Sequence, residues 1–198
     1  MSIRLVDGSY AAPYQTRWGE GWVYVRDGEL AGVDLPGEAG GPCKLSADCP
    51  EVGAGDEPGG ADGPAAPDAE ALAFWVGELQ AYFRGERTTW TPKEVPLGCL
   101  GLGVFERGVY EALLSVPPGE TVTYGELAEM AGYPRAARAV GNAMANNPIP
   151  VVVPCHRVVR SNGSLGNYGN DPSWKERLLR HEGWTCAGGN AGGSAERS

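Results

Sequence analysis

The hydrophobic positions of the N-terminal half predict one amphipathic helix. Within residues 69–84, Leu72, Trp75, Val76, Leu79 and Phe83 recur every three or four positions. That spacing places their side chains on one face of a helix. Gly85 follows, a residue suited to ending a helix.

Residues 17–34 have the shorter period of strands. Val23 and Val25 alternate with Trp22, Tyr24 and Arg26. The sequence then reads Arg26-Asp27-Gly28-Glu29, and Asp-Gly is a strong signal for a hairpin turn. We expect two antiparallel strands joined there.

The second half begins with a helical pattern over about 104–115, which Pro117-Pro118-Gly119 ends. Thr123 and Glu126 then have the spacing of a capping box, which predicts a helix over 124–131. Gly132-Tyr133 turns the chain, and Pro134 suits the first turn of a helix that reaches about Asn146. Two short helices joined by a tight turn form a helix-turn-helix pattern.

A last helix is expected from Asp171-Pro172 to near Gly183, with Trp174, Leu178 and Leu179 on its apolar face. Together these elements predict an α/β N-terminal domain at 1–95. A mainly α-helical domain with a winged helix-turn-helix-like DNA-binding motif follows at 96–185. Residues 186–198 are expected to be a disordered tail.

Residues 34–70 interrupt the first domain with eight Gly, six Pro and nine acidic residues against one Lys. Such a segment buries too little apolar surface to order itself as a core element. We interpret it as a mobile acidic surface insert.

The formal net charge of −9 is unevenly distributed. Residues 1–95 hold 7 basic and 16 acidic side chains, whereas residues 96–198 hold 9 of each. Four arginines and no acid fall within 134–160. An acidic chain repels phosphate, but here the repulsion belongs to the first half, so the second can still bind DNA with modest, salt-sensitive affinity.

Residues 134–146 are rich in small side chains, namely Ala136, Ala137, Ala139, Gly141 and Ala143. A major-groove reader normally carries long polar side chains. The small surface fits either close packing between helices or a helix in a narrow minor groove, with Arg138 as its one long residue.

Cysteine is the candidate nucleophile. Of the five cysteines, Cys43, Cys49, Cys99 and Cys186 have no chemically suggestive neighbours, and the absence of a C-x-x-C pair argues against a zinc finger. Cys155 instead precedes His156, and an imidazole can give a thiol the thiolate character that a nucleophile needs.

On an extended chain, Cys155 and His156 point to opposite sides, so contact between them needs a water or a local turn. The imidazole also needs a partner to fix its tautomer. Glu182, four residues after Leu178 on the buried side of the last helix, is the candidate, because an unpaired acid there is costly. The alternative interpretation is a buried structural cysteine beside a surface histidine.

The motif PCHRVV at 154–159 resembles the O6-alkylguanine-DNA alkyltransferase family. Asn147-Pro-Ile-Pro150 precedes it, Gly166-Asn167-Tyr168 and His181-Glu182-Gly183 follow it, and the resemblance is dense over about 104–183. It implies a DNA repair protein that flips O6-alkylguanine, and in some cases O4-alkylthymine, out of duplex DNA. The alkyl group then passes irreversibly to Cys155, once per molecule.

The resemblance also assigns roles to residues. His156 deprotonates Cys155 through a water, Glu182 polarises His156, and Asn147 is a hinge. Tyr124 helps turn the nucleotide and donates to guanine N3, and Arg138 fills the gap in the base stack. The DNA-binding set adds Ala136, Ala137, Ala139 and Gly141, and the substrate pocket comprises Val158, Tyr168, Gly169, Met144 and Pro150. Gly169 stands where some members carry Ser.

The family's zinc-binding set in the first domain has no match here, so we expect no metal, and because the cysteine is itself the acceptor, no cofactor. The expected partner is double-stranded DNA bound by its minor groove. The N-terminus lacks the apolar core of a signal peptide and no stretch is long enough to span a membrane, so we expect a cytoplasmic monomer, nucleoid-associated in a prokaryote. The alternatives are a non-catalytic sensor of alkylated bases, a methylation-responsive regulator, and a Cys-His hydrolase.

Overall fold

A computed structural model describes residues 2–5, 7–37, 64–166, 168–169, 171 and 173–185 of the chain. Its N-terminal part is an antiparallel sheet with strand order β1–β2–β3–β4. The strands are β1 (Ile3–Arg4), β2 (Tyr10–Thr16), β3 (Gly19–Arg26) and β4 (Glu29–Asp34). The predicted hairpin is confirmed as β3 and β4, turning at Asp27-Gly28, both of which have positive φ.

The hydrophobic pattern did not predict β1 and β2. Pro13 lies in the middle of β2 and normally argues against a central strand. Here β1 pairs with β2 only at Tyr10 and Ala11, so β2 is an edge strand at Pro13, where a missing N–H costs no hydrogen bond.

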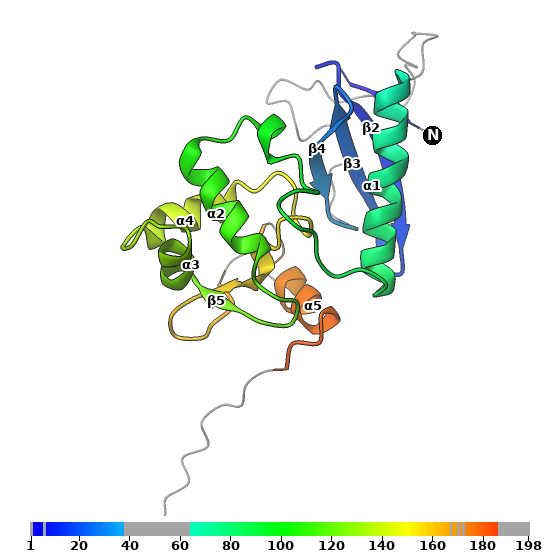
Figure 1. The fold of residues 1–198 in the computed structure, drawn as a ribbon. Helices are drawn as coiled ribbons and strands as arrows, with labels where there is room; N and C mark the ends of the chain where they lie inside the picture. Colours follow the sequence, from blue (N-terminus) through cyan, green and yellow to red (C-terminus); the bar gives the residue numbers. More distant parts are fainter. Residues whose placement is uncertain are drawn as a thin grey trace, which may run out of the picture.

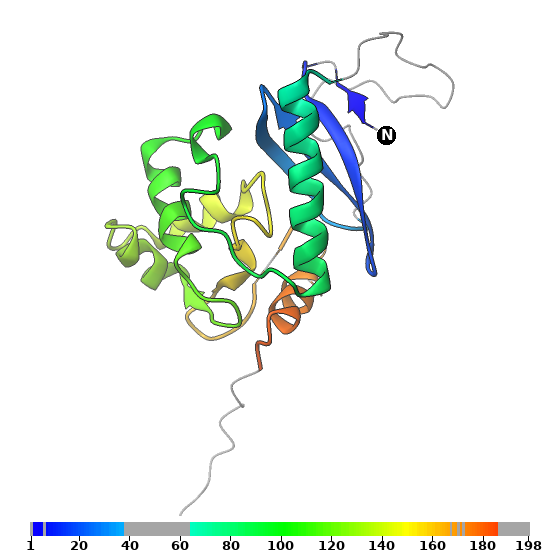
Figure 2. The ribbon, with the colours of Figure 1, turned by 45° about the vertical axis from the view of Figure 1, so that its right-hand side comes forward.

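Helix α1 (Ala66–Arg84) covers one face of the sheet (Figures 1 and 2). It begins three residues earlier than the predicted helix and ends at Gly85 in the left-handed conformation, as expected. Pro67 and Asp68 lie in its first turn, where both residue types suit a helix start. The Gly28 N–H of the hairpin turn also donates to the Asp68 carboxylate (2.8 Å).

The predicted bounds of the insert, 34–70, are too wide at both ends. Asp34 ends β4, residues 36–37 form a turn, and α1 begins at Ala66. Residues 38–63, with Cys43 and Cys49, lie outside the described residues, as do 186–198.

The C-terminal part is mainly helical, as predicted. Its elements are η2 (Leu97–Leu100), α2 (Val104–Leu114), β5 (Val122–Thr123), α3 (Tyr124–Met130), α4 (Ala137–Ala145), η3 (Cys155–Arg157), β6 (Val158–Val159) and α5 (Ser173–His181). The capping box is confirmed, since the Glu126 N–H donates to the Thr123 hydroxyl (3.2 Å) and the Thr123 N–H to the Glu126 carboxylate (2.7 Å). Beside α3, β5 and β6 form a parallel pair.

The predicted start of the helix after α3 is wrong. Pro134 does not lie in its first turn, because Arg135 has a φ of +74°, outside the helical region. The Ala136 N–H donates to the Tyr133 carbonyl (3.1 Å), which closes a turn, and α4 begins only at Ala137.

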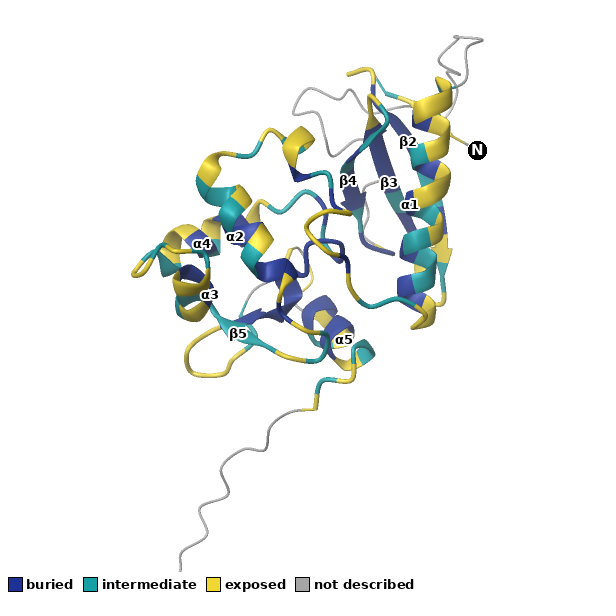
Figure 3. Cartoon of the chain, viewed as in Figure 1, coloured by how far each residue is buried: buried dark blue, intermediate teal, exposed yellow. Residues whose placement is uncertain are grey.

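The two parts share one connected hydrophobic core. Buried residues line the strands and the inward side of α1, whereas α3 and α4 carry much of the exposed surface (Figure 3). The parts are also joined by backbone, because the Val33 N–H of β4 donates to the Pro148 carbonyl (2.9 Å). The N-terminal sheet thereby holds the loop that leads to Cys155.

Candidate active site

A tight loop delivers Cys155 to the protein interior. The Val153 N–H donates to the Ile149 carbonyl (3.0 Å) and the Cys155 N–H to the Val153 carbonyl (2.8 Å). Val151 has a φ of +75°, a strained conformation for a β-branched residue. The chain then enters η3, so Cys155 and His156 lie in a local turn, which was one of the two alternatives left open.

Asn147 connects this loop to the sulfur. Its Nδ2 donates to Cys155 Sγ (3.1 Å) and to the Val153 carbonyl (2.9 Å), and its Oδ1 accepts from the Ile149 N–H (3.1 Å). One amide side chain thus fixes both the loop and the nucleophile. The hinge role that the resemblance implies for Asn147 stays a prediction.

The sulfur rests as a thiol. Cys155 is 6% exposed and lies 3.6 Å from the Tyr168 hydroxyl, to which it donates. Burial raises the pKa of Cys155 above its ordinary 9.0, although hydrogen bonds with Asn147 and Tyr168 and the charge of Lys175 favour the thiolate. Nucleophilic attack at neutral pH therefore requires a base.

His156 and Glu182 are paired as the sequence suggests, since His156 Nε2 lies 2.8 Å from Glu182 Oε1 with both side chains buried. Burial lowers the pKa of His156, opposed by Glu182 and reinforced by Arg157 and Lys175. If Nε2 carries the proton toward Glu182, Nδ1 has a free lone pair. Among the described residues, Nδ1 has no hydrogen-bond partner. In that tautomer, His156 Nδ1 can act as a base and accept a proton.

Arg157 is one of the four arginines within 134–160, and it is 1% exposed. Its Nε donates to Glu182 Oε2 (2.8 Å) and its Nη2 to Glu182 Oε1 (2.9 Å). Burial alone raises the pKa of Glu182, but His156 and Arg157 outweigh it and hold that pKa well below 4.5. Glu182 is therefore ionised at neutral pH.

Tyr124 and Lys175 form a further pair of side chains. Tyr124 begins α3 and is half-buried, and the Lys175 ammonium is 5.9 Å from the centre of its ring. Lys175 also donates to the Val158 carbonyl. Burial lowers the pKa of Lys175 to about 8. Cys155 influences the pKa of both Tyr124 and Lys175, so the three side chains share one electrostatic environment.

The residues expected to line the substrate pocket differ in how far they are buried. Met144, Val158 and Tyr168 join Cys155 in the hydrophobic core, and Pro150 is partly buried. Gly169 is exposed and has a φ of +47°, in the left-handed region that L side chains adopt rarely. Glycine rather than serine therefore suits the backbone there.

Helix α4 presents small residues outward. Val140, Ala143 and Met144 form its buried face, whereas Arg138 and Ala139 are exposed. Ala136, Ala137 and Gly141 are partly exposed, and a Cβ added to Gly141 would meet nothing within 4 Å. Packing between helices explains Ala143, but it does not explain the small size of Gly141.

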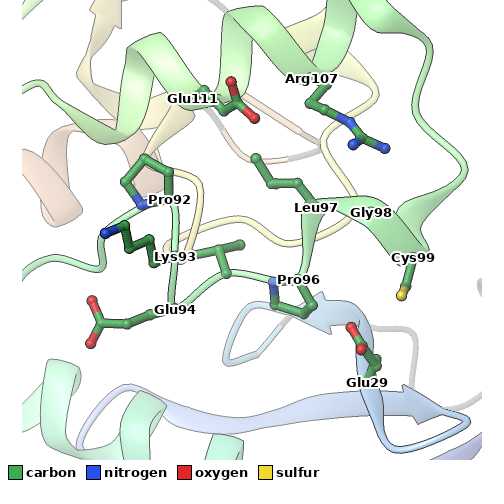
Figure 4. A pocket seen from close by; sticks show the side chains of 11 residues that line it. Glu29, Pro92, Lys93, Glu94, Pro96, Leu97, Gly98, Cys99, Arg107 and Glu111 are labelled. Atoms are coloured by element: carbon green, nitrogen blue, oxygen red, sulfur yellow. The ribbon is translucent and has the colours of Figure 1, made fainter.

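A pocket of about 450 Å³ lies away from Cys155 (Figure 4). Glu29 from β4, Cys99 from η2 and Arg107 from α2 are among its lining residues. None of the predicted site residues lines it. In the part of the chain that the structure describes, no cluster of three or more His, Cys, Asp or Glu could hold a metal, and no helix is long and apolar enough to cross a membrane.

The chain is similar to known methyltransferases. The family model described as 6-O-methylguanine DNA methyltransferase, DNA binding domain, matches residues 104–184. The methylated-DNA–protein-cysteine methyltransferase of Mycobacterium tuberculosis H37Rv is 46% identical over 116 residues, which cover 59% of this chain and 68% of that protein. The Mus musculus protein of the same name is 44% identical over 132 residues, covering 63% and 59%.

Solved structures extend the similarity to the N-terminal part. A variant of the M. tuberculosis O6-methylguanine methyltransferase superposes with a TM-score of 0.65 at 32% identity, covering 88% of this chain and 92% of that one. M. tuberculosis OGT in complex with DNA superposes with a TM-score of 0.63 at 32% identity, covering 87% of this chain and 91% of that one. This chain belongs to the methylated-DNA–protein-cysteine methyltransferase family.

Proposed function

We propose that the protein repairs alkylated DNA by transferring the alkyl group from O6 of guanine to Cys155. The observation that carries the proposal is the buried arrangement of a thiol held by Asn147 beside a histidine whose Nε2 is paired to Glu182. Family membership favours the same chemistry. No cofactor or metal has a part in it, because the cysteine is the final acceptor.

The steps follow from the charges of these groups. His156 Nδ1 accepts the thiol proton, through a water, and the thiolate forms a bond to the alkyl carbon while the carbon–O6 bond breaks. The electron pair of the broken bond stays with the guanine. The Tyr124 hydroxyl donates to N3, so that the purine need not leave as a full anion. The S-alkylcysteine is stable, so each molecule acts once.

Access to the base requires it to leave the duplex, since Cys155 is buried. We propose that α3 and α4 act as a helix-turn-helix motif, in winged form, whose second helix enters the minor groove. The exposed Arg138 takes the place of the flipped base, and Ala136, Ala137, Ala139 and Gly141 allow close approach. Val158, Tyr168, Gly169, Met144 and Pro150 surround the extruded base.

The same proposal has three further parts. The chain divides into two domains at residue 95, the protein also accepts O4-alkylthymine, and it acts as a monomer.

Mass spectrometry after incubation with duplex DNA containing O6-methylguanine tests the transfer. We expect one methyl group on the Cys155 peptide and no further gain with excess DNA. Cys155→Ser abolishes the transfer, whereas Cys99→Ser, which alters an exposed free cysteine, leaves it intact. An unmodified Cys155 peptide after complete DNA binding contradicts the proposal and favours a sensor of alkylated bases.

A further inference from the structure

Glu182 is bound from distant parts of the chain. Its Oε1 accepts hydrogen bonds from Tyr82 (2.8 Å), His156 (2.8 Å) and Arg157 (2.9 Å). Its Oε2 accepts from Arg157 (2.8 Å), with the Gly119 N–H at 3.4 Å. The carboxylate side chain has no exposed surface. His156 therefore shares its partner oxygen with two other donors.

The donor from the N-terminal part is Tyr82, near the end of α1 and 100 residues before Glu182. Burial raises the pKa of Tyr82 well above 10, and the neighbouring Glu182 charge adds to this, so the phenol keeps its proton. The Tyr82 backbone is also fixed, because its carbonyl lies 2.6 Å from His181 Nε2. The position of the hydroxyl relative to Glu182 is thus set at two points.

Arg157 is the fixed cation of the group. Besides Glu182, its guanidinium donates to the Val116 carbonyl (2.6 Å) and the Thr88 carbonyl (2.7 Å), which hold it in place. A guanidinium does not lose its proton in a protein. The negative charge of Glu182 is therefore largely balanced before His156 is considered.

We propose that Tyr82 is a positioning residue that shares Glu182 Oε1 with His156 and, with Arg157, weakens the pull of Glu182 on the imidazole proton. His156 thereby stays neutral, with Nδ1 able to accept the proton of Cys155. This role rests on the proposed function. It makes α1 of the N-terminal part a component of the catalytic arrangement.

The groups that face His156 decide its protonation. Glu182 favours the imidazolium, and Arg157 and Lys175 oppose it together with burial. Removing the Tyr82 hydroxyl leaves these charges in place but gives Glu182 Oε1 one donor fewer. The remaining hydrogen bond from His156 Nε2 then strengthens, and the imidazolium becomes easier to form.

Nuclear magnetic resonance of the imidazole nitrogens in the full chain tests this, because the chain contains two histidines. In Tyr82→Phe we expect the Nε2 proton of His156 to move downfield and its protonation to shift to higher pH by roughly one unit, a tenfold change in the equilibrium. The matched control is Tyr24→Phe, which removes another buried phenol that donates to a carboxylate, that of Asp34 (2.6 Å). Tyr24→Phe leaves both the Nε2 proton shift and the protonation pH of His156 unchanged.

A second variant keeps the fold intact. Incorporation of 3-fluorotyrosine at position 82 makes the phenol a stronger donor and moves the Nε2 proton in the opposite direction. An unchanged His156 resonance in both Tyr82 variants, or an equal shift in Tyr24→Phe, overturns the role of Tyr82. These measurements need no DNA. A shift without alkyl transfer to Cys155 would therefore reject the proposed function and retain the coupling.

Discussion

The cluster around Glu182 and the outward face of α4 are built in opposite ways. In the cluster, the charged side chains are buried, and Glu182 accepts hydrogen bonds from Arg157, 25 residues before it, and from Tyr82, 100 residues before it. On α4, Arg138 and Ala139 are exposed, and a Cβ at Gly141 would meet no protein atom within 4 Å. Both regions carry part of the proposed function.

The two regions differ in whether a substitution affects the stability of the fold or only the proposed function. Removing Arg157 or Glu182 leaves a buried charge without its partner, so chemistry and folding depend on the same contacts. The outward residues of α4 support no contact of that kind. Substitutions there are expected to alter DNA binding and to leave the fold intact.

The largest effect is expected from Arg157→Met. It leaves the Glu182 carboxylate buried without its cation, which costs about 3–5 kcal/mol of unfolding free energy. Urea denaturation of the full chain measures the loss. Arg138→Met is the matched change on α4 and leaves the midpoint where it is in the wild type. Equal midpoints for the two variants would contradict the contrast between the regions.

Arg138→Ala addresses function on the exposed side. If Arg138 fills the base stack, its loss slows alkyl transfer from duplex DNA by roughly 10- to 100-fold. Reaction with free O6-benzylguanine needs no base stack and changes little. Arg180→Ala, at an exposed arginine on α5, serves as the control and affects neither substrate. Equal losses on the two substrates would reject the role of Arg138.

Local sequence signals were sufficient for much of the fold. The Thr123–Glu126 capping box placed α3, Asp27-Gly28 placed the hairpin, and Gly85 placed the end of α1. Each is decided by a few neighbouring residues. The start of α4 escaped prediction because the positive φ of Arg135 is imposed by the turn and left no mark in the residue type.

The candidate site was predicted where residue type, spacing or the family's motif marked its members. Cys155 and His156 came from their adjacency, Glu182 from its place on the buried side of the last helix, and Asn147 from the family's pattern. The pairing of His156 with Glu182 is confirmed in the structure. The roles of Tyr82, Arg157 and Lys175 were missed. Their burial is created by elements that meet only after folding, and no local pattern marks an arginine or lysine as buried.

Acid offers a finer test of the cluster. The pKa of Glu182 in the folded protein lies well below its ordinary 4.5, so its stabilisation is complete above that value. It is lost as the pH falls below about 4.5, because the unfolded chain then binds the proton first. The loss is at most about 1.4 kcal/mol per pH unit.

Urea denaturation between pH 5 and pH 3 compares the wild type with Glu182→Gln. We expect the shallower decline in the variant, which has lost this titration. Glu94, whose pKa is lowered to about 2 chiefly by hydrogen bonds from Thr91, contributes equally to both proteins and cancels. Identical slopes would mean that Glu182 is not selectively stabilised as an anion.

The smallest effect concerns one methyl group on α4. Gly141→Ala places a Cβ in open space inside a helix, so the free energy of unfolding rises by about 1 kcal/mol. Gly77→Ala makes the same change on the exposed side of α1 and gives a similar gain. If α4 lies against DNA, only the methyl at position 141 stands between protein and duplex. Affinity for duplex DNA, measured by fluorescence anisotropy, then falls in Gly141→Ala alone, and equal affinities in the two variants would place this face of α4 away from the groove.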